Sequence, residues 1–237
     1  MSSGLSLSEV SKRTGVSRSA IRDWRDRPDA GRWPSTCCRC AADVAQPDGP
    51  AYAHLLGLYL GDGCVSALRN NVYSLRIACC DAYPRLMAEC EASVRAVRPG
   101  KVFRVSSDGC TYILALWKHW PCLFPQHGPG RKHDRAIVLE PWQREIVERH
   151  PGPFLRGLFH SDGCRITNWT VRMVAGQPKR YEYPRYFFTN ASADICGLCC
   201  WALGLVGAEH RHPTERDISV ARKASVAILD ELVGPKS

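Results

Sequence analysis

The sequence predicts an α+β protein in which two similar halves follow a small all-α helix-turn-helix segment. Three observations lead to this prediction. A polar N-terminal stretch has the spacing of two short helices, an apolar helix ending in aspartate occurs twice, and each copy precedes the same succession of strand and helix patterns. The predicted divisions are residues 1–30 for the helix-turn-helix, 31–50 for a linker, 51–150 for the first half with its connection, and 151–237 for the second half.

The composition favours a polyanionic partner. Of the 237 residues, 45% are hydrophobic, enough for a sizeable core, and Lys and Arg outnumber Asp and Glu by 32 to 23, which gives a net charge of +9. Double-stranded DNA is the partner that this charge favours. No apolar run approaches the roughly 20 residues of a membrane helix, and the N-terminus lacks the layout of a signal peptide. We therefore expect a cytoplasmic, nucleoid-associated protein without a membrane partner.

Thirteen cysteines, an odd number, occur in this long chain without an export signal. We expect reduced thiols that behave mainly as small buried hydrophobes. Zinc binding at Cys37, Cys38 or Cys40 is the alternative. A second C-x-x-C, Cys196 and Cys199, falls inside a predicted helix and has no spaced partner pair.

The stretch LSLSEVSKRTGVSRSAIRDWRDR predicts a helix, a tight turn and a second helix. Ser6 and Glu9 have the spacing of a capping box, Gly15 breaks the first helix, and Ser17 is a second N-cap. The segment resembles the helix-turn-helix of MerR-like regulators and recombinases, in which the second helix reads the major groove. The arginines expected on its outward face are Arg18, Arg22 and Arg25.

Two apolar stretches, HLLGLYLGDG and FLRGLFHSDG, predict the central helices of the two halves. They end at Asp62 and Asp162, which are 162 − 62 = 100 residues apart. After the first copy we expect strands at 73–80, 101–105 and 111–118 and a helix at 81–97. After the second we expect strands at 186–190, 208–212 and 217–223 and helices at 192–207 and 224–233. The succession of helix, two strands, helix and two strands therefore occurs twice, which indicates duplication with pseudo-twofold symmetry.

Small residues spaced four apart predict that the two central helices lie against each other. These interface residues are Gly57, Gly61, Gly157 and Ser161. If the helices pack side by side, Asp62 and Asp162 meet at the same end, where the helix dipoles already disfavour negative charge. Two such carboxylates suit a hard divalent cation, Mg²⁺ or Mn²⁺, which binds oxygen ligands and promotes phosphodiester hydrolysis.

With these motifs, residues 51–235 resemble the LAGLIDADG homing endonucleases in their single-chain form. The resemblance implies two αββαββα halves whose sheets straddle DNA. It implies that Asp62 and Asp162 bind the catalytic metals, approached by the carbonyl groups of Gly61 and Ser161. It also implies basic residues beside the active site, for which the equivalent Lys118 and Lys223 are the candidates. Arg156 departs from the motif, which has alanine there.

Further contacts to DNA are expected from the strands and from a basic loop. In VYSLRIA, Ser74 and Arg76 alternate with apolar residues and are expected to face the major groove. The loop GPGRKHDR, with Arg131 and Lys132, has the composition of a phosphate-tracking segment. The other candidates are Arg69, Arg165, Arg172 and Arg185.

The sequence thus predicts a monomeric, site-specific endonuclease that hydrolyses both strands of double-stranded DNA, with the helix-turn-helix extending the recognised site. Two alternatives remain open. The same fold serves as a DNA-binding transcriptional regulator that does not cut, or as an RNA maturase that assists intron splicing. Retention of both aspartates favours the endonuclease.

Overall fold

The computed structural model describes residues 6–14, 18 and 48–236 and divides into two compact units, residues 1–38 and 39–237. In the first unit, helix α1 spans Leu7–Thr14. Its predicted capping box is present, because Glu9 N donates to Ser6 Oγ at 3.3 Å and Ser6 N donates to Glu9 Oε2 at 2.9 Å. Arg18 is exposed and donates to Ser8 Oγ. The predicted second helix, with Arg22 and Arg25, lies outside the described residues.

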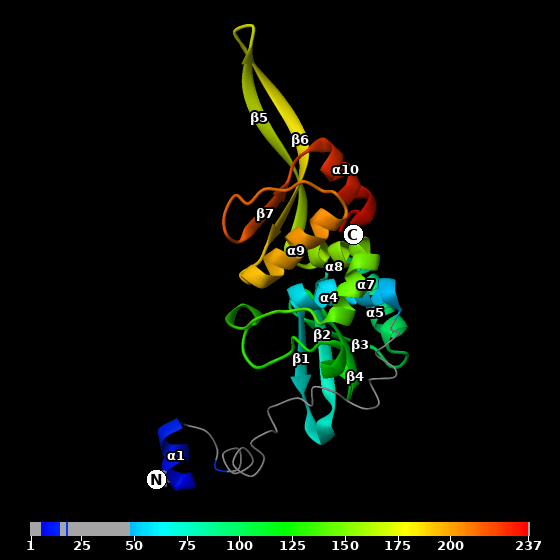
Figure 1. Ribbon diagram of the computed structural model, residues 1–237, viewed down its shortest axis with the longest axis vertical. Helices are drawn as coiled ribbons and strands as arrows, with labels where there is room; N and C mark the ends of the chain where they lie inside the picture. The colour runs from blue at the N-terminus through cyan, green and yellow to red at the C-terminus, as the bar shows by residue number, and fades with distance from the viewer. Residues whose placement is uncertain (1–5, 15–17, 19–47, 237) are drawn as a thin grey trace. The chain divides into compact units, whose positions relative to one another are not determined.

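The second unit is a mixed α+β body with two antiparallel sheets (Figure 1). Its first part contains helices α4 (Gly49–Asp62), α5 (Pro84–Val97) and α6 (Trp120–Leu123), the 3₁₀ turn η1 (Arg69–Asn71), and strands β1 (Gly63–Ala67), β2 (Tyr73–Cys80), β3 (Phe103–Ser107) and β4 (Cys110–Trp117). A connection follows with η2 (Lys132–Asp134) and α7 (Pro141–Arg149). The second part contains helices α8 (Pro151–Asp162), α9 (Ala193–Leu205) and α10 (Lys223–Leu232) and strands β5 (Gly163–Val174), β6 (Gln177–Thr189) and β7 (Asp217–Val220).

The three strands of the second sheet correspond in order and register to β1, β2 and β4 of the first. The strand orders of the two sheets are β1-β2-β4-β3 and β5-β6-β7, so the strand that follows each motif helix lies at an edge. In the first sheet Gly63 pairs with Ile77, which pairs with Ile113. In the second sheet Gly163 pairs with Phe188, which pairs with Ile218. The glycine after each aspartate therefore occupies the same place in its sheet.

The second sheet lacks the strand that the sequence predicts at 208–212. Only an isolated bridge between Arg211 and Ser219 forms there. The prediction was wrong because Pro213 has no N–H to continue a ladder, and β7 is only four residues long. In contrast, β5 and β6 form a hairpin much longer than the predicted strand at 186–190, and it projects beyond the rest of the sheet (Figure 1).

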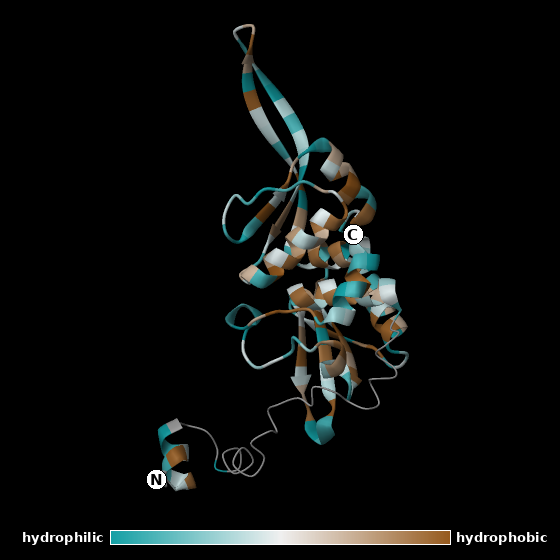
Figure 2. Ribbon diagram, viewed as in Figure 1, coloured by the Kyte–Doolittle hydropathy of each residue, from teal (hydrophilic) through white to brown (hydrophobic). Residues whose placement is uncertain are grey.

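The motif helices α4 and α8 form the centre of the unit, where apolar residues gather (Figure 2). In α4 every residue from Tyr52 to Leu60 is buried. A Cβ atom on Gly57 would lie 2.4 Å from Phe154 O, and one on Gly157 would lie 2.2 Å from His54 O. These distances leave no room for a side chain, so the two helix backbones touch at the paired glycines.

The arginine that departs from the motif has partners. Arg156 donates from Nε to Glu89 Oε2 at 3.0 Å and from Nη2 to both carboxylate oxygens, and it also donates to Val233 O. Glu89 belongs to α5, so this ion pair fastens α8 to a helix of the other half. Next to it lie the buried side chains of His54 and His160.

Across residues 6–14, 18 and 48–236, no helix has both the length and the apolar character that crossing a bilayer requires.

Candidate metal site and nucleic-acid surface

The two motif aspartates lie at the same end of the helix pair. Asp62 and Asp162 are the last residues of α4 and α8, and each is followed by a glycine that opens a strand. A Cβ atom on Gly61 would lie 2.0 Å from Ser161 Oγ and 3.0 Å from Asp162 Oδ2. The Asp162 carboxylate is thus next to the backbone that leads into Asp62, and the close approach of the helices positions both acids.

Both aspartates have a pKa above the usual value for a carboxyl group. Burial raises the pKa of Asp62, and the negative charge of Asp162 raises it further. Part of the Asp62 side chain nevertheless remains exposed to solvent, and this exposure limits the rise in its pKa. Burial also raises the pKa of the half-buried Asp162, although Asn190 Nδ2 donates to its Oδ2 at 2.6 Å and favours the charged form. A cation bound between the carboxylates would relieve both costs.

Two lysines that sequence analysis did not assign to the aspartates supply charge there. Lys132 Nζ donates to Leu60 O at 2.8 Å and to Gly61 O at 2.6 Å. Lys236 Nζ donates to Ser161 O at 3.1 Å and to Gly163 O at 3.0 Å. Each ammonium group therefore caps the C-terminal end of one motif helix, where carbonyl groups lack partners within the helix.

The charge of both lysines acts on both aspartates and lowers the pKa of each. Burial lowers the pKa of Lys132 to about 8, and burial likewise lowers that of Lys236. Lys132 was predicted to track DNA phosphates from an exposed loop. The structure instead folds this half-buried side chain onto the end of α4, because the uncapped carbonyl groups and the carboxylates attract it.

The predicted catalytic lysines lie elsewhere. Lys118 is exposed directly after β4, five residues beyond Ile113, the β4 residue level with Gly63. At about 3.3 Å per residue, the strand carries Lys118 roughly 16 Å away from Asp62. Lys223 is equivalent in register, five residues beyond Ile218, and opens α10. The expected equivalence therefore appears in the strands, whereas the cations that act on the aspartates are Lys132 and Lys236.

The donor set fits a divalent cation through its carboxylates. Both aspartates offer hard oxygen atoms at the same end of the helix pair, and the raised pKa values mark a place where a cation is favourable. The carbonyl groups of Gly61 and Ser161, expected to approach metal, accept hydrogen bonds from Lys132 and Lys236 in this structure. The carboxylates of Asp62 and Asp162 are therefore the donors that remain for a metal.

Several of the expected DNA-contacting arginines are available on the outer sheet faces. Arg76 is exposed on β2, opposite the buried Leu75 and Ile77, and its guanidinium lies 5.8 Å from the ring centroid of Tyr112. On the second sheet, strand alternation places Arg172 on the same face as Arg185. Arg69 is exposed in η1 and Arg131 is exposed just before η2.

Two expected contacts are not available in this way. Ser74 is buried, with 4% of its surface exposed, so a small hydroxyl on β2 does not reach the surface as strand alternation predicted. Arg165 pairs with Tyr186 on the helix-covered face of its sheet and forms a two-point ion pair with Asp230 of α10, at 2.6 and 3.0 Å. The register places Arg165 on the inner face, where Asp230 is its partner.

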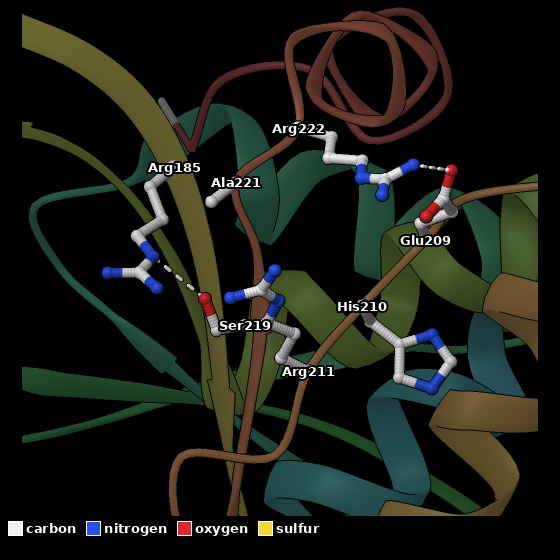
Figure 3. Close-up of a pocket in the computed structure, with 7 residues that line it drawn as sticks. All are labelled: Arg185, Glu209, His210, Arg211, Ser219, Ala221 and Arg222. Atoms are coloured by element: carbon white, nitrogen blue, oxygen red, sulfur yellow. Dashed lines mark hydrogen bonds and ion pairs between the residues drawn. The ribbon is translucent and has the colours of Figure 1, made fainter.

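An arginine-rich pocket on the second sheet was not predicted (Figure 3). Arg185 Nε donates to Ser219 Oγ at 2.7 Å, and its guanidinium lies 4.7 Å from the ring centroid of Phe187. The bridge to β7 places Arg211 beside it. Such a cluster suits a phosphate group. The lining residues are Arg185, Glu209, His210, Arg211, Ser219, Ala221 and Arg222.

Comparisons with known proteins add structural similarities only. No protein-family model matches the chain, and no curated protein matches it. Among solved structures, I-DmoI in complex with DNA and Ca is 13% identical and shares 81% of this chain and 95% of its own, with a TM-score of 0.47. The LAGLIDADG meganuclease I-AabMI bound to uncleaved DNA is 11% identical over 77% and 83%, with a TM-score of 0.48. The N-terminal LAGLIDADG domain of DUF199/WhiA is 13% identical over 80% and 83%, with a TM-score of 0.47.

Proposed function

We propose that this chain is a site-specific, homing-type DNA endonuclease that hydrolyses phosphodiester bonds in both strands, with Asp62 and Asp162 holding divalent metal, Mg²⁺ or Mn²⁺. The observation that carries this proposal is the position of Asp162 Oδ2 beside the backbone of Gly61 at the glycine-packed ends of α4 and α8. Neighbouring carboxylates at the ends of two packed helices, each of which leads into an antiparallel sheet, suit metal-assisted attack on a phosphodiester.

The proposed roles follow from the contacts of each residue. A bound divalent cation would activate water and stabilise the leaving oxygen. Asn190 orients Asp162 through its hydrogen bond of 2.6 Å. Lys132 and Lys236 balance the negative charge of the carboxylates and fix the ends of the motif helices.

We also propose that the two parts of the second unit are duplicated halves. The correspondence of β5, β6 and β7 to β1, β2 and β4, and the equal register of Gly63 and Gly163, support this. A duplicated chain already supplies both halves of a twofold site, so we propose a monomer. DNA would bind along the outer sheet faces through Arg76, Arg172 and Arg185, and the N-terminal helix-turn-helix would extend the recognised sequence.

One observation favours a second function, a DNA-binding regulator that does not cut. Lys132 and Lys236 donate to Gly61 O and Ser161 O, and their charges lower the pKa of both aspartates. A site compensated by its own ammonium groups can remain folded without metal. In that case the aspartates and lysines would stabilise the contact between the two halves, and the sheets would bind DNA.

Cleavage and binding must be measured separately to distinguish the two functions. The substrate is a plasmid that carries the DNA flanking the gene, joined as an uninterrupted site. Wild-type protein, Asp62→Asn and Asp162→Asn are compared in Mg²⁺ and in Mn²⁺, with Lys118→Ala as an exposed control. Binding to the same DNA is measured by gel mobility shift in Ca²⁺.

The endonuclease proposal predicts cleavage by wild type and by Lys118→Ala. Each Asn variant should lose at least about 100-fold in rate, because a metal-holding carboxylate contributes several kcal/mol and each 1.4 kcal/mol is tenfold. Binding should be retained by both Asn variants. Tight binding by a wild-type protein that never cuts would establish the regulator instead.

A further inference from the structure

In the second half, one cysteine on α9 and two histidines in the segment before β7 lie close together. His210 and His212 flank Arg211, whose backbone N donates to Ser219 O at 2.9 Å and whose O accepts from Ser219 N at 2.8 Å. In such an extended segment, residues two apart project to the same side. The two imidazole rings accordingly lie 5.7 Å apart between centroids, and Figure 3 shows the His210 ring directed away from the arginines.

The third member of the cluster comes from the helix that faces this segment. Cys200 lies on α9, and its Sγ is 3.3 Å from His212 Nε2. One ligand atom from each of Cys200, His210 and His212 can be chosen so that all lie within 4.8 Å of one another. In tetrahedral zinc sites, bond lengths of about 2.0–2.3 Å place ligand atoms roughly 3.3–3.8 Å apart. Rotation of the side chains is enough to close that difference.

The neighbouring cysteines of α9 have other environments. Cys199 is fully buried, and Cys196 donates to the carbonyl groups of Asn190 and Arg216. Cys200, in contrast, is only half-buried, as is His210, and His212 is exposed. The C-x-x-C pattern in this helix therefore does not supply the metal ligands, whereas the cysteine directly after it faces the histidines.

Nearby positive charge is directed elsewhere. The Arg211 guanidinium lies in the pocket on the opposite side of its segment from the His210 ring (Figure 3). Arg222 is paired with Glu209. A cation beside Cys200 therefore does not confront an unpaired guanidinium at close range.

We propose that Cys200, His210 and His212 bind one Zn²⁺ ion, with a water molecule as the fourth ligand on the exposed side. Thiolate and imidazole ligands select zinc over the hard cations proposed for the aspartates. Binding replaces the thiol proton of Cys200, which is released to solvent. The ion would join α9 to the segment that carries Arg211, and thereby fix one wall of the arginine-rich pocket. This site is independent of the proposed nuclease activity.

The test uses the full chain, stripped with a chelator and titrated with Co²⁺ as a spectroscopic probe, followed by displacement with Zn²⁺. Thiolate ligation gives a sulfur-to-cobalt charge-transfer absorption. The variants are Cys200→Ser and His212→Ala, and Cys80→Ser serves as the control because it removes an exposed thiol on β2. A chain with Cys37, Cys38 and Cys40 all changed to Ser separates this site from any at those residues, which lie outside the described part of the chain.

The expected result is one equivalent of metal with the charge-transfer band in wild type, in Cys80→Ser and in the triple variant. Cys200→Ser should lose the band, and both site variants should bind Zn²⁺ at least about 100-fold more weakly, since even an indirect supporting residue is worth about 10–100-fold. Circular dichroism of His212→Ala, which changes an exposed side chain, checks that the chain is folded. An unchanged charge-transfer band in folded Cys200→Ser, or no band in the chain with Cys37, Cys38 and Cys40 all changed to Ser, would overturn the proposal.

Discussion

At the scale of single residues, the smallest side chains determine where the carboxylates lie. Gly57 and Gly157 allow two helix backbones to touch, and one turn later Gly61 meets Ser161. The two aspartates follow immediately in the chain. Their proximity is therefore a consequence of absent side chains rather than of any attraction between two negative groups.

The first prediction concerns a glycine in this contact. Gly157→Ala would place a methyl group 2.2 Å from His54 O, so the helices must separate. We expect the free energy of unfolding to fall by about 1–3 kcal/mol or more, the usual cost of overpacking. The matched control is Gly197→Ala on α9, where a Cβ atom meets nothing within 4 Å. This control should gain roughly 0.5–1 kcal/mol from helix propensity. Both values come from urea denaturation, and equal effects of the two substitutions would contradict the close helix contact.

The sequence could not predict which lysines lie near the aspartates, because those contacts join residues far apart in the chain. The aspartates could be found because each ends a recognisable helix. Lys132 lies 71 residues after Gly61, and Lys236 lies 75 after Ser161, the carbonyl groups to which they donate. No local pattern connects residues at such separations, and a lysine in a polar loop resembles any other. The sequence instead favoured Lys118 and Lys223, which share a register but lie away from the carboxylates.

At the scale of elements, hydrophobic periodicity predicted most helices and strands. Strand β2 has the predicted limits, and β4 is displaced from its predicted range by one residue at each end. The predictions of secondary structure failed in segments whose structure depends on contacts with distant parts of the chain. An isolated bridge replaces the strand expected at 208–212, and the hairpin of β5 and β6 extends through exposed residues that carry no buried alternation.

A second prediction concerns the interface of α4, α5 and α8. His54 Nδ1 lies 2.8 Å from Ser93 Oγ, and its ring is buried beside His160, Arg156 and Glu89. Burial, with the positive charges of His160 and Arg156, lowers its pKa to about 4, against the slight opposing effect of Glu89. The unfolded chain, with a histidine pKa of about 6.5, binds more protons between these values. Stability is therefore fully present above about pH 6.5 and is lost as the pH falls toward 4, by up to roughly 3 kcal/mol for this group.

His54→Gln removes this titration and retains a polar partner for Ser93. We expect the free energy of unfolding of the variant to change less steeply between pH 6.5 and 4 than that of wild type, as measured by urea denaturation at each pH. Exposed His133 supplies the control, and His133→Gln should leave the slope unchanged. An identical slope in wild type and His54→Gln would show that His54 is not held neutral by burial.

A third prediction concerns the outer face of the second sheet. If Arg185 and Arg211 neutralise DNA phosphates, replacing both with Ala should reduce the slope of log affinity against log salt concentration by about two, since each phosphate contact contributes about 0.9. Arg165 lies on the inner face and is paired with Asp230, so Arg165→Ala should preserve the slope. Fluorescence anisotropy with labelled duplex DNA at several salt concentrations gives these slopes. If Arg165→Ala lowers the slope and the double substitution of Arg185 and Arg211 does not, DNA does not bind the outer face of this sheet.

At the scale of the whole molecule, two parts that have three corresponding strands in the same order meet through one pair of helices. This arrangement puts one carboxylate from each part at the seam, with one lysine from each following segment. Sequence repetition was sufficient to predict the pairing of the parts and the residues at the helix contact. It could not show which cations accompany the carboxylates, because that depends on how the connection and the C-terminal segment fold back.

The central claim is that Asp62 and Asp162 serve one shared metal site, and a double-mutant cycle on Mn²⁺ affinity tests it most directly. Binding is measured by electron paramagnetic resonance on the DNA-bound chain for wild type, Asp62→Asn, Asp162→Asn and the double variant. The account predicts that each single substitution removes most of the affinity and that the double variant loses less than their sum, by more than about 1 kcal/mol, as residues sharing a ligand do. Strictly additive losses, or Mn²⁺ affinity unaffected by either substitution, would contradict it.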